Sequence, residues 1–315
     1  MSGFGRRGLL LAGVGMLAGC SASSGKQASG TSVPSGTGSS AGTPSARTPT
    51  TPTSSTPTPS GPSSAPASET PREIVLPRVR SWAPGPGELE PAAKRAAVAA
   101  VVELLRSRDT RGVVEVIDAQ YGGILSDTAS VLVPCRSFTL ADSRVVTGGT
   151  TVDVRLTKTQ GTWRVTAMHP AQPGKATTQL SPAARQVLSN ARIALPPASA
   201  ADIRSGQVHE SVLAAMLELA GTYRIDVSVI RSGHPINVFG TDRPSDHPRG
   251  RAFDTWQIDG RAVVDPATPR ALVTSYMRAT ESLGSYNVGG PYQLPGPAYF
   301  SDRTHHDHIH AGFRT

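Results

Sequence analysis

Alternating apolar and polar residues mark the most regular part of the chain, on either side of Gln160-Gly161. The alternation covers residues 150–158 and 162–168 and has the period of two that half-buried strands show. Two such runs joined by a short glycine-containing turn predict a β-hairpin. Upstream, residues 91–106 (PAAKRAAVAAVVELLR) carry alanine and leucine at helical spacing, and residues 130–133 predict a further strand.

The first folded region, residues 73–173, is therefore expected to be a small α+β domain with one helix and an antiparallel sheet. At this coarse level it resembles NTF2-like and cystatin-like modules. We find no motif for catalysis or metal binding within it. Docking of a protein partner is the hypothesis that its sequence leaves open.

A second folded region is expected over residues 176–315. Its apolar spacing predicts helices over 181–190, 208–221 and 269–284, and strands over 225–230 and 308–313. This mixture of helices and strands again indicates an α+β fold.

The first 20 residues predict an export signal. Arg6 and Arg7 precede an apolar segment, residues 8–16, that is too short to span a bilayer. The signal ends in the sequence LAGC, which resembles the lipobox of bacterial lipoproteins. That resemblance implies cleavage before Cys20, attachment of diacylglycerol and palmitate there, and anchoring on the extracytoplasmic face of the cell membrane. General secretion and twin-arginine export both remain open.

Residues 21–72 are expected to form a disordered linker. Within residues 21–70, 45 of 50 residues are Ser, Thr, Pro, Gly or Ala. Such a segment buries too little apolar surface to offset the entropy of ordering it. A flexible chain of this length reaches roughly 40 Å, which would let the folded regions work away from the membrane and within the cell wall.

Charge and apolar content exclude two other classes of protein. The net charge is +8, from 27 Arg and 4 Lys against 23 acidic residues, but the basic residues form no dense run and no aromatic-rich stripe. We therefore expect no nucleic-acid partner. No apolar run reaches the roughly 18 residues of a membrane span, which argues against a multi-span membrane protein.

Histidines gather in the C-terminal part of the second region, in the segments 245–254 (SDHPRGRAFD) and 305–310 (HHDHIH). A catalytic zinc ion takes three nitrogen or oxygen ligands and keeps a fourth position open for water. His247, Asp254 and His310 can supply two imidazoles and one carboxylate. The two segments therefore predict a Zn²⁺ site.

Local geometry is consistent with that ligand set. His308 and His310 stand two apart, so on a strand they share a face. His247 and Asp254 are seven apart and would point to opposite faces of a regular strand. The intervening proline and glycine break that regularity, which allows His247 to fold back from a loop toward Asp254.

The pattern SxHxxGxAxD followed by HxH resembles the zinc peptidases of peptidoglycan. These include the D-Ala-D-Ala carboxypeptidases, the D-Ala-D-Ala dipeptidases of vancomycin resistance and the L-Ala-D-Glu endopeptidases, whose fold the hedgehog signalling domain shares. The first part of the pattern is matched completely, by Ser245, His247, Gly250, Ala252 and Asp254. The resemblance covers the last 100 to 140 residues and implies an α+β domain with a central antiparallel sheet.

The resemblance implies roles for individual residues. The zinc ligands would be the three named above, with Ser245 and His305 supporting them. Asp307, three residues before the last ligand, matches the catalytic carboxylate of many members, whereas His308 has the strand parity expected of a group in the site. Either residue is a candidate for the base that takes a proton from water. Arg231 is the candidate for holding the substrate carbonyl.

The expected function is that of a lipid-anchored zinc peptidase that hydrolyses peptide bonds in peptidoglycan stem peptides. Whether it is an endopeptidase or a carboxypeptidase stays open. The alternative is a zinc-containing module that binds the cell wall or a protein without cutting it. His234 lies outside both histidine segments, so we expect it to be a loop residue.

Overall fold

The computed structural model describes residues 74–314. The predicted export signal, the predicted lipidation residue Cys20 and the predicted linker over 21–72 lie outside the described residues. Residues 74–314 lie within one compact unit. Within the described range, no helix combines the length and the apolar character needed to cross a membrane.

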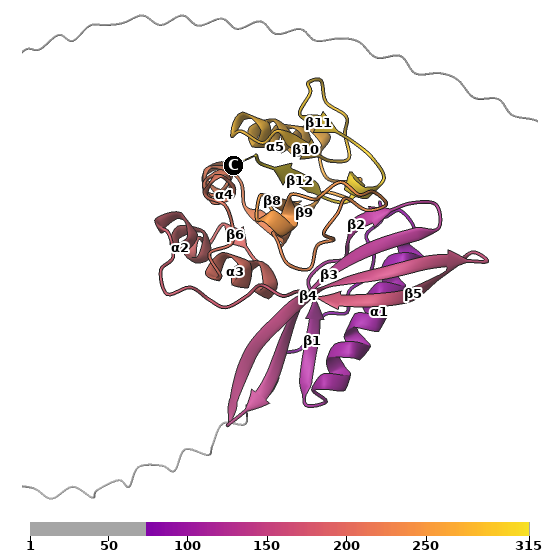
Figure 1. The fold of residues 1–315 in the computed structure, drawn as a ribbon. Helices are drawn as coiled ribbons and strands as arrows, with labels where there is room; N and C mark the ends of the chain where they lie inside the picture. Colours follow the sequence, from indigo (N-terminus) through magenta and orange to yellow (C-terminus); the bar gives the residue numbers. More distant parts are fainter. Residues whose placement is uncertain (1–73, 315) are drawn as a thin grey trace, which may run out of the picture. The chain divides into compact units, whose positions relative to one another are not determined.

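The first part of this unit is a five-stranded antiparallel sheet with one helix against it (Figure 1). The elements are α1 (Pro91–Arg108), β1 (Gly112–Val116), β2 (Gln120–Ile124), β3 (Thr128–Ala141), β4 (Arg144–Thr159) and β5 (Thr162–Pro170). The strands follow the order β1-β3-β4-β5, and β2 also pairs with β3.

The predicted hairpin is confirmed as β4 and β5. Gln160 and Gly161 join the two strands with φ angles of 49° and 77°. Positive φ at both turn positions matches the right-handed twist of the flanking strands, which is why a glycine stands in this turn. The predicted helix is confirmed as α1, which begins at Pro91, a residue whose missing N–H costs nothing in the first helical turn.

The buried face of α1 packs on the sheet and forms its own hydrophobic cluster. Ala93, Ala97 and Val101 are fully buried against residues of β1, β3 and β4. A lysine, Lys94, is buried on the same helix. An ammonium group in such surroundings needs anionic partners, and these come from elsewhere in the chain.

The second part is built around a seven-stranded mixed sheet. Its strands are β6 (Ile193–Ala194), β7 (Ile225–Val229), β8 (Ala252–Ile258), β9 (Arg261–Ala262), β10 (Asn287–Gly289), β11 (Tyr299–Phe300) and β12 (Ile309–Gly312). The order is β11-β10-β12-β8-β7-β6, with β9 paired to β8. The central pairs are antiparallel, and the two outermost pairs are parallel.

Four helices belong to this second part: α2 (Pro182–Ser189), α3 (Pro197–Arg204), α4 (Glu210–Thr222) and α5 (Arg270–Ser282). A second hydrophobic cluster forms where α2, α3, α4 and α5 meet the apolar residues of the sheet. The α+β class predicted from the sequence is confirmed. The expected helices correspond to α2, α4 and α5, whereas α3 was not anticipated.

Strand β2 was also not predicted, because its sequence, QYGGI, shows no alternation and contains two adjacent glycines. All five of its residues are buried. A Cβ on Gly123 would lie 2.1 Å from the Cβ of Phe239, so only glycine permits this approach to the loop over residues 231–246. The glycines therefore bring β2 close to the second part of the chain.

Candidate metal centre

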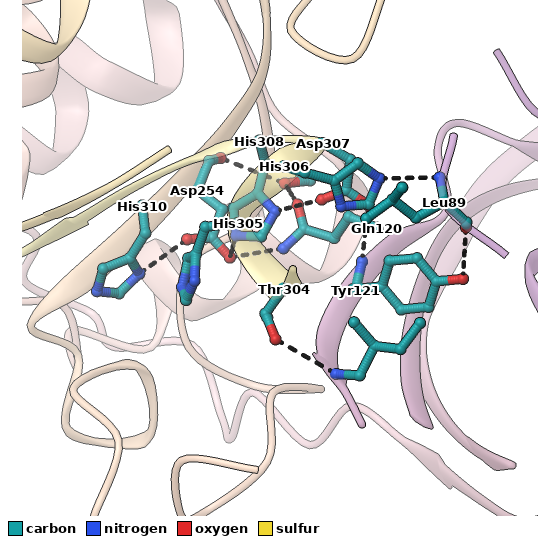
Figure 2. Close-up of polar contacts among 12 residues, drawn as sticks. Leu89, Gln120, Tyr121, Asp254, Thr304, His305, His306, Asp307, His308 and His310 are labelled. Carbon is teal, nitrogen blue, oxygen red and sulfur yellow. Dashed lines mark hydrogen bonds and ion pairs between the residues drawn. The ribbon is translucent and has the colours of Figure 1, made fainter. Parts of the chain in front are cut away.

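Strands β8 and β12 place two of the predicted ligands side by side. His310 is the direct register partner of Asp254 in this antiparallel pair. The Nδ1 atom of His310 lies 3.0 Å from the Oδ1 atom of Asp254 (Figure 2). Residues 56 positions apart are thus brought together by the pairing of two strands.

His247 completes the set from a short 3-10 turn, His247–Arg249. Its Nε2 atom lies 3.1 Å from Oδ1 of Asp254 and 3.1 Å from Nδ1 of His310. Gly250 closes the turn with a φ of 69°, and a Cβ there would lie 1.9 Å from the carbonyl oxygen of Gln207. Glycine at this position therefore allows His247 to fold back toward Asp254.

Few protons lie between the facing nitrogen and oxygen atoms of these three side chains, so a cation fits among them. The Nδ1 atom of His247 donates to the carbonyl oxygen of Ile230 at 2.8 Å, which in the neutral ring places the lone pair on Nε2. That lone pair faces a carboxylate oxygen of Asp254, and at most one proton, on His310, could lie among the three atoms. A tetrahedral zinc ion with bonds of about 2.1 Å would set its ligand atoms about 3.4 Å apart, close to the spacing observed.

Ionisation of the site suits metal binding. Burial lowers the pKa of His310 to about 4, which keeps its ring neutral at pH 7. Burial alone would raise the pKa of Asp254, but the neighbouring His247 and His308 outweigh it and hold that pKa well below its usual range. His310 therefore presents a neutral imidazole and Asp254 an ionised carboxylate, the forms that coordinate metals.

His234, expected to be a loop residue, does lie in the loop over residues 231–246, yet it belongs to the site. Its ring stacks on that of His247, with centroids 4.1 Å apart and an interplanar angle of 17°. Ligand atoms of His234, His247 and Asp254 all lie within 4.8 Å of one another. The described residues thus include a group that could hold a metal ion, and His234 brings an additional nitrogen to it.

Asp307 and His308 form a hydrogen-bonded pair beside this centre. The Nδ1 atom of His308 lies 2.6 Å from Oδ1 of Asp307, and its Nε2 atom lies 3.7 Å from Oδ2 of Asp254. The other oxygen of Asp307 accepts from Lys94 Nζ at 2.6 Å and from the backbone N–H of Tyr121 at 3.0 Å. Both oxygens of Asp307 are therefore engaged, whereas His308 faces the centre.

The charges of this pair follow from the same contacts. Burial would raise the pKa of Asp307, but the Lys94 ammonium and His308 outweigh it and hold the pKa far below its usual range. Burial would lower the pKa of His308, but Asp254 and Asp307 outweigh it and raise that pKa above its ordinary value. Asp307 is an anion that stabilises a proton on its histidine neighbour.

Glu88, His306 and Asp307 form a second group of potential ligands. A cation is already present there, because Lys94 Nζ contacts both Glu88 and Asp307. The ring of His306 is also engaged, since its Nδ1 atom donates to the carbonyl of Arg303 at 2.7 Å and its Nε2 atom accepts from the N–H of Leu89 at 3.1 Å. This group is an internal ion pair, not a second metal site.

Gln120 of β2 reaches the centre from the first sheet. Its Nε2 atom donates to Oδ2 of Asp254 at 2.6 Å, and its Oε1 atom accepts from the hydroxyl of Ser228 (Figure 2 shows the contact with Asp254). Residues 73–173 contain no motif for catalysis or metal binding, yet Lys94 and Gln120 contact site residues 213 and 134 positions away. No local motif signals contacts over such separations.

Three further residues predicted for the site, Ser245, His305 and Arg231, differ in how closely they approach the centre. Ser245 is buried, and its hydroxyl accepts from the N–H of His247 at 3.3 Å, so it supports the turn. The ring of His305 lies 5.6 Å from that of His310 and bonds to Asp302. Arg231 lies against Asp202, with Nη1 3.6 Å from Oδ1, and does not line the cavity beside the centre.

That cavity has a volume of about 790 Å³ and opens beside the candidate ligands. Three arginines, Arg243, Arg249 and Arg303, line it together with aromatic side chains such as Tyr299 and Phe300. Residues of β2 form part of the same wall. The space next to the candidate metal centre therefore offers arginine side chains to a ligand, beside the carboxylates of Asp246 and Asp302.

Comparisons with protein-family models, with curated proteins and with solved structures found no match to this chain.

Proposed function

We propose that this protein is a zinc-dependent peptidase that hydrolyses peptide bonds in peptidoglycan stem peptides. The observation that carries the proposal is the convergence of His247 Nε2, Asp254 Oδ1 and His310 Nδ1 within 3.1 Å of one another. Two imidazoles and one carboxylate form the ligand set of many catalytic zinc sites. Magnesium and calcium prefer oxygen ligands, which makes them a poor fit to two histidines.

When bound to these residues, zinc supplies Lewis acidity that polarises a carbonyl and eases the deprotonation of water. The chain supplies the remaining functions. In its neutral form, His308 presents the lone pair of Nε2 toward the centre, where it can take a proton from the attacking water and return it to the leaving amine. Asp307 accepts the Nδ1–H of His308 and holds the ring in the tautomer that this transfer requires.

Both Asp307 and His308 were candidates for the base from the sequence, and the contacts favour His308. A base needs an unengaged lone pair close to the reacting water. Asp307 directs one oxygen to His308 and the other to Lys94 and Tyr121. Its role in the proposed reaction is therefore to orient the imidazole.

The cavity lining and the predicted export signal both support the proposed substrate. Stem peptides carry free carboxylates, which the arginines of the cavity wall can pair with in bidentate fashion. Arg231, which faces Asp202, is not part of this arrangement. We further propose that lipid attached to Cys20 holds the protein at the outer face of the cell membrane, with the linker giving it access to the wall.

The test is hydrolysis of defined muropeptides by the full chain purified in detergent. We expect a shortened stem peptide that disappears when a chelator removes the metal and returns when Zn²⁺ is added. Mass spectrometry of the products identifies the bond, and cleavage at an internal or at a C-terminal bond would each support the proposal. If no stem peptide gives a chelator-sensitive product, the proposal is wrong.

A non-catalytic zinc module is the second candidate, and His234 is the observation that favours it. Structural zinc sites are closed by four protein ligands, and His234 brings a nitrogen near the other candidate ligands. A closed site would bind one equivalent of zinc tightly and hydrolyse nothing. Stoichiometric metal together with inert muropeptides would select this function over the first.

A further inference from the structure

We infer that Lys94 and Gln120, both from the first sheet and its helix, are positioning residues of the metal centre. The inference rests on the proposed peptidase function and extends it to a part of the chain that shows no catalytic motif. Lys94 acts on His308 through Asp307, and Gln120 acts on the metal ligand Asp254. Residues 74–173 would then be a fixed component of the active site and not a separate docking module.

The burial of Lys94 indicates a role beyond stability. Its side chain is 1% exposed, on a helix face otherwise formed by alanine and valine. Burying an ammonium and its carboxylate partners carries a desolvation penalty, and apolar residues of similar volume often stabilise a fold as well or better. The ion pair fixes Asp307 in a single position, which an apolar residue could not do.

The position of Asp307 determines which nitrogen of His308 carries the proton. Lys94 Nζ and the N–H of Tyr121 both donate to Oδ2, so Oδ1 remains for His308. As an acceptor, Oδ1 selects the tautomer of His308 with a proton on Nδ1 and a lone pair on Nε2. That lone pair is the one required for proton transfer at the centre.

The orientation of the Gln120 amide is determined by its surroundings in the same way. The hydroxyl of Ser228 donates to Oε1, which directs Nε2 toward Oδ2 of Asp254. The second oxygen of Asp254 is thereby satisfied, and Oδ1 is left facing the two imidazoles. Hydrogen bonds of this kind around metal ligands fix their orientation and tune their affinity.

Strand β2 is held against the site segment by backbone contacts as well. The N–H of Tyr121 donates to Asp307, and the N–H of Ile124 donates to the hydroxyl of Thr304 at 3.3 Å (Figure 2). Gly123 of β2 also leaves room for Phe239 of the loop over residues 231–246. Gln120 and Tyr121 therefore reach the centre from a strand that is anchored at both ends.

The first test concerns Lys94 and reads the tautomer of His308 directly. In Lys94→Met combined with Glu88→Gln, the cluster loses one positive and one negative charge, which avoids leaving two carboxylates unpaired in the interior. Long-range ¹H–¹⁵N spectra of the histidines, at a pH where His308 is neutral, should show the Nδ1–H form in the unmodified chain. We expect a mixture with the Nε2–H form in the variant, and a 10- to 100-fold lower kcat with KM changed less than about twofold.

Lys158→Met is the matched control, because Lys158 forms an ion pair with Glu90 in the same region but does not contact the site. It should leave both the tautomer and kcat unchanged. An unaltered tautomer and kcat in the Lys94 variant would overturn the role of Lys94. The spectra do not require turnover, so absence of hydrolysis in the unmodified chain would reject the proposed function without deciding this point.

The second test concerns Gln120 and measures metal affinity. We expect Gln120→Leu to weaken zinc binding by about 10- to 100-fold in competition with a chromophoric chelator, because Oδ2 of Asp254 loses its partner. Gln186→Leu, at an exposed position of α2, is the control and should bind as the unmodified chain does. Equal affinity in both variants would overturn the role of Gln120. If His247→Ala also left affinity unchanged, the metal centre itself would be wrong.

Discussion

Replacement of Asp254 by alanine is expected to abolish both stoichiometric zinc binding and hydrolysis of stem peptides. The carboxylate is the only anionic member of the three-residue set, and it contacts His247, His310 and Gln120 at once. Without it, two imidazoles remain, and none of the remaining candidate ligands carries a negative charge to offset that of a divalent cation. Metal content after dialysis and the initial rate on muropeptides measure the two effects.

Asp242→Ala is the control for this variant, because Asp242 is an exposed residue of a nearby loop that does not line the cavity. It should retain both metal and activity. Thermal unfolding of the two variants checks that the Asp254 variant still folds cooperatively. Stoichiometric zinc in a folded Asp254 variant would contradict the assignment of the centre.

Asp307→Asn is expected to lower kcat by about 10³- to 10⁴-fold while zinc affinity stays nearly unchanged. Lys94 and the N–H of Tyr121 both donate to one side of residue 307, so the amide oxygen of asparagine should take that side. Its NH₂ group would then face Nδ1 of His308 and donate to it. The ring proton would move to Nε2, and the base would lose its lone pair at the centre.

Single-turnover rates and metal titrations on the same preparation measure the loss of rate and the zinc affinity separately. His308→Gln, which removes the proposed base, should show a loss of similar size, and the double variant should lose little more, because residues acting as one unit are not additive. A rate within tenfold of the unmodified chain for Asp307→Asn would remove Asp307 and its tautomer effect from the mechanism.

Arg231 and His234 show that spacing along the sequence does not predict which residues of a loop reach the candidate site. The family pattern suggested Arg231 as a group facing the substrate, but its backbone N–H and side chain lie against Asp202. His234, which no motif included, stacks on His247. Both residues belong to the loop over 231–246. The path of such an irregular segment depends on tertiary packing, which the periodicity of the sequence does not encode.

The amino-acid sequence by itself determined the α+β class, the helix α1, the hairpin of β4 and β5, and the three candidate ligands. The elements follow from interactions between near neighbours, such as apolar spacing and turn residues, and the candidate ligands stand in two short motifs, SxHxxGxAxD and HxH. Such patterns extend over a few residues and are visible in the amino-acid sequence alone.

Only the tertiary structure decided that Lys94 and Gln120 belong to the centre and that Asp307 is engaged on both oxygens. The contacts of Lys94 and Gln120 join residues more than 100 positions apart, and that of Gln120 comes from a glycine-rich strand whose own sequence resembles a loop. Burial makes each such polar group find a partner, but the partner is selected by the packing of whole sheets, which no local pattern contains.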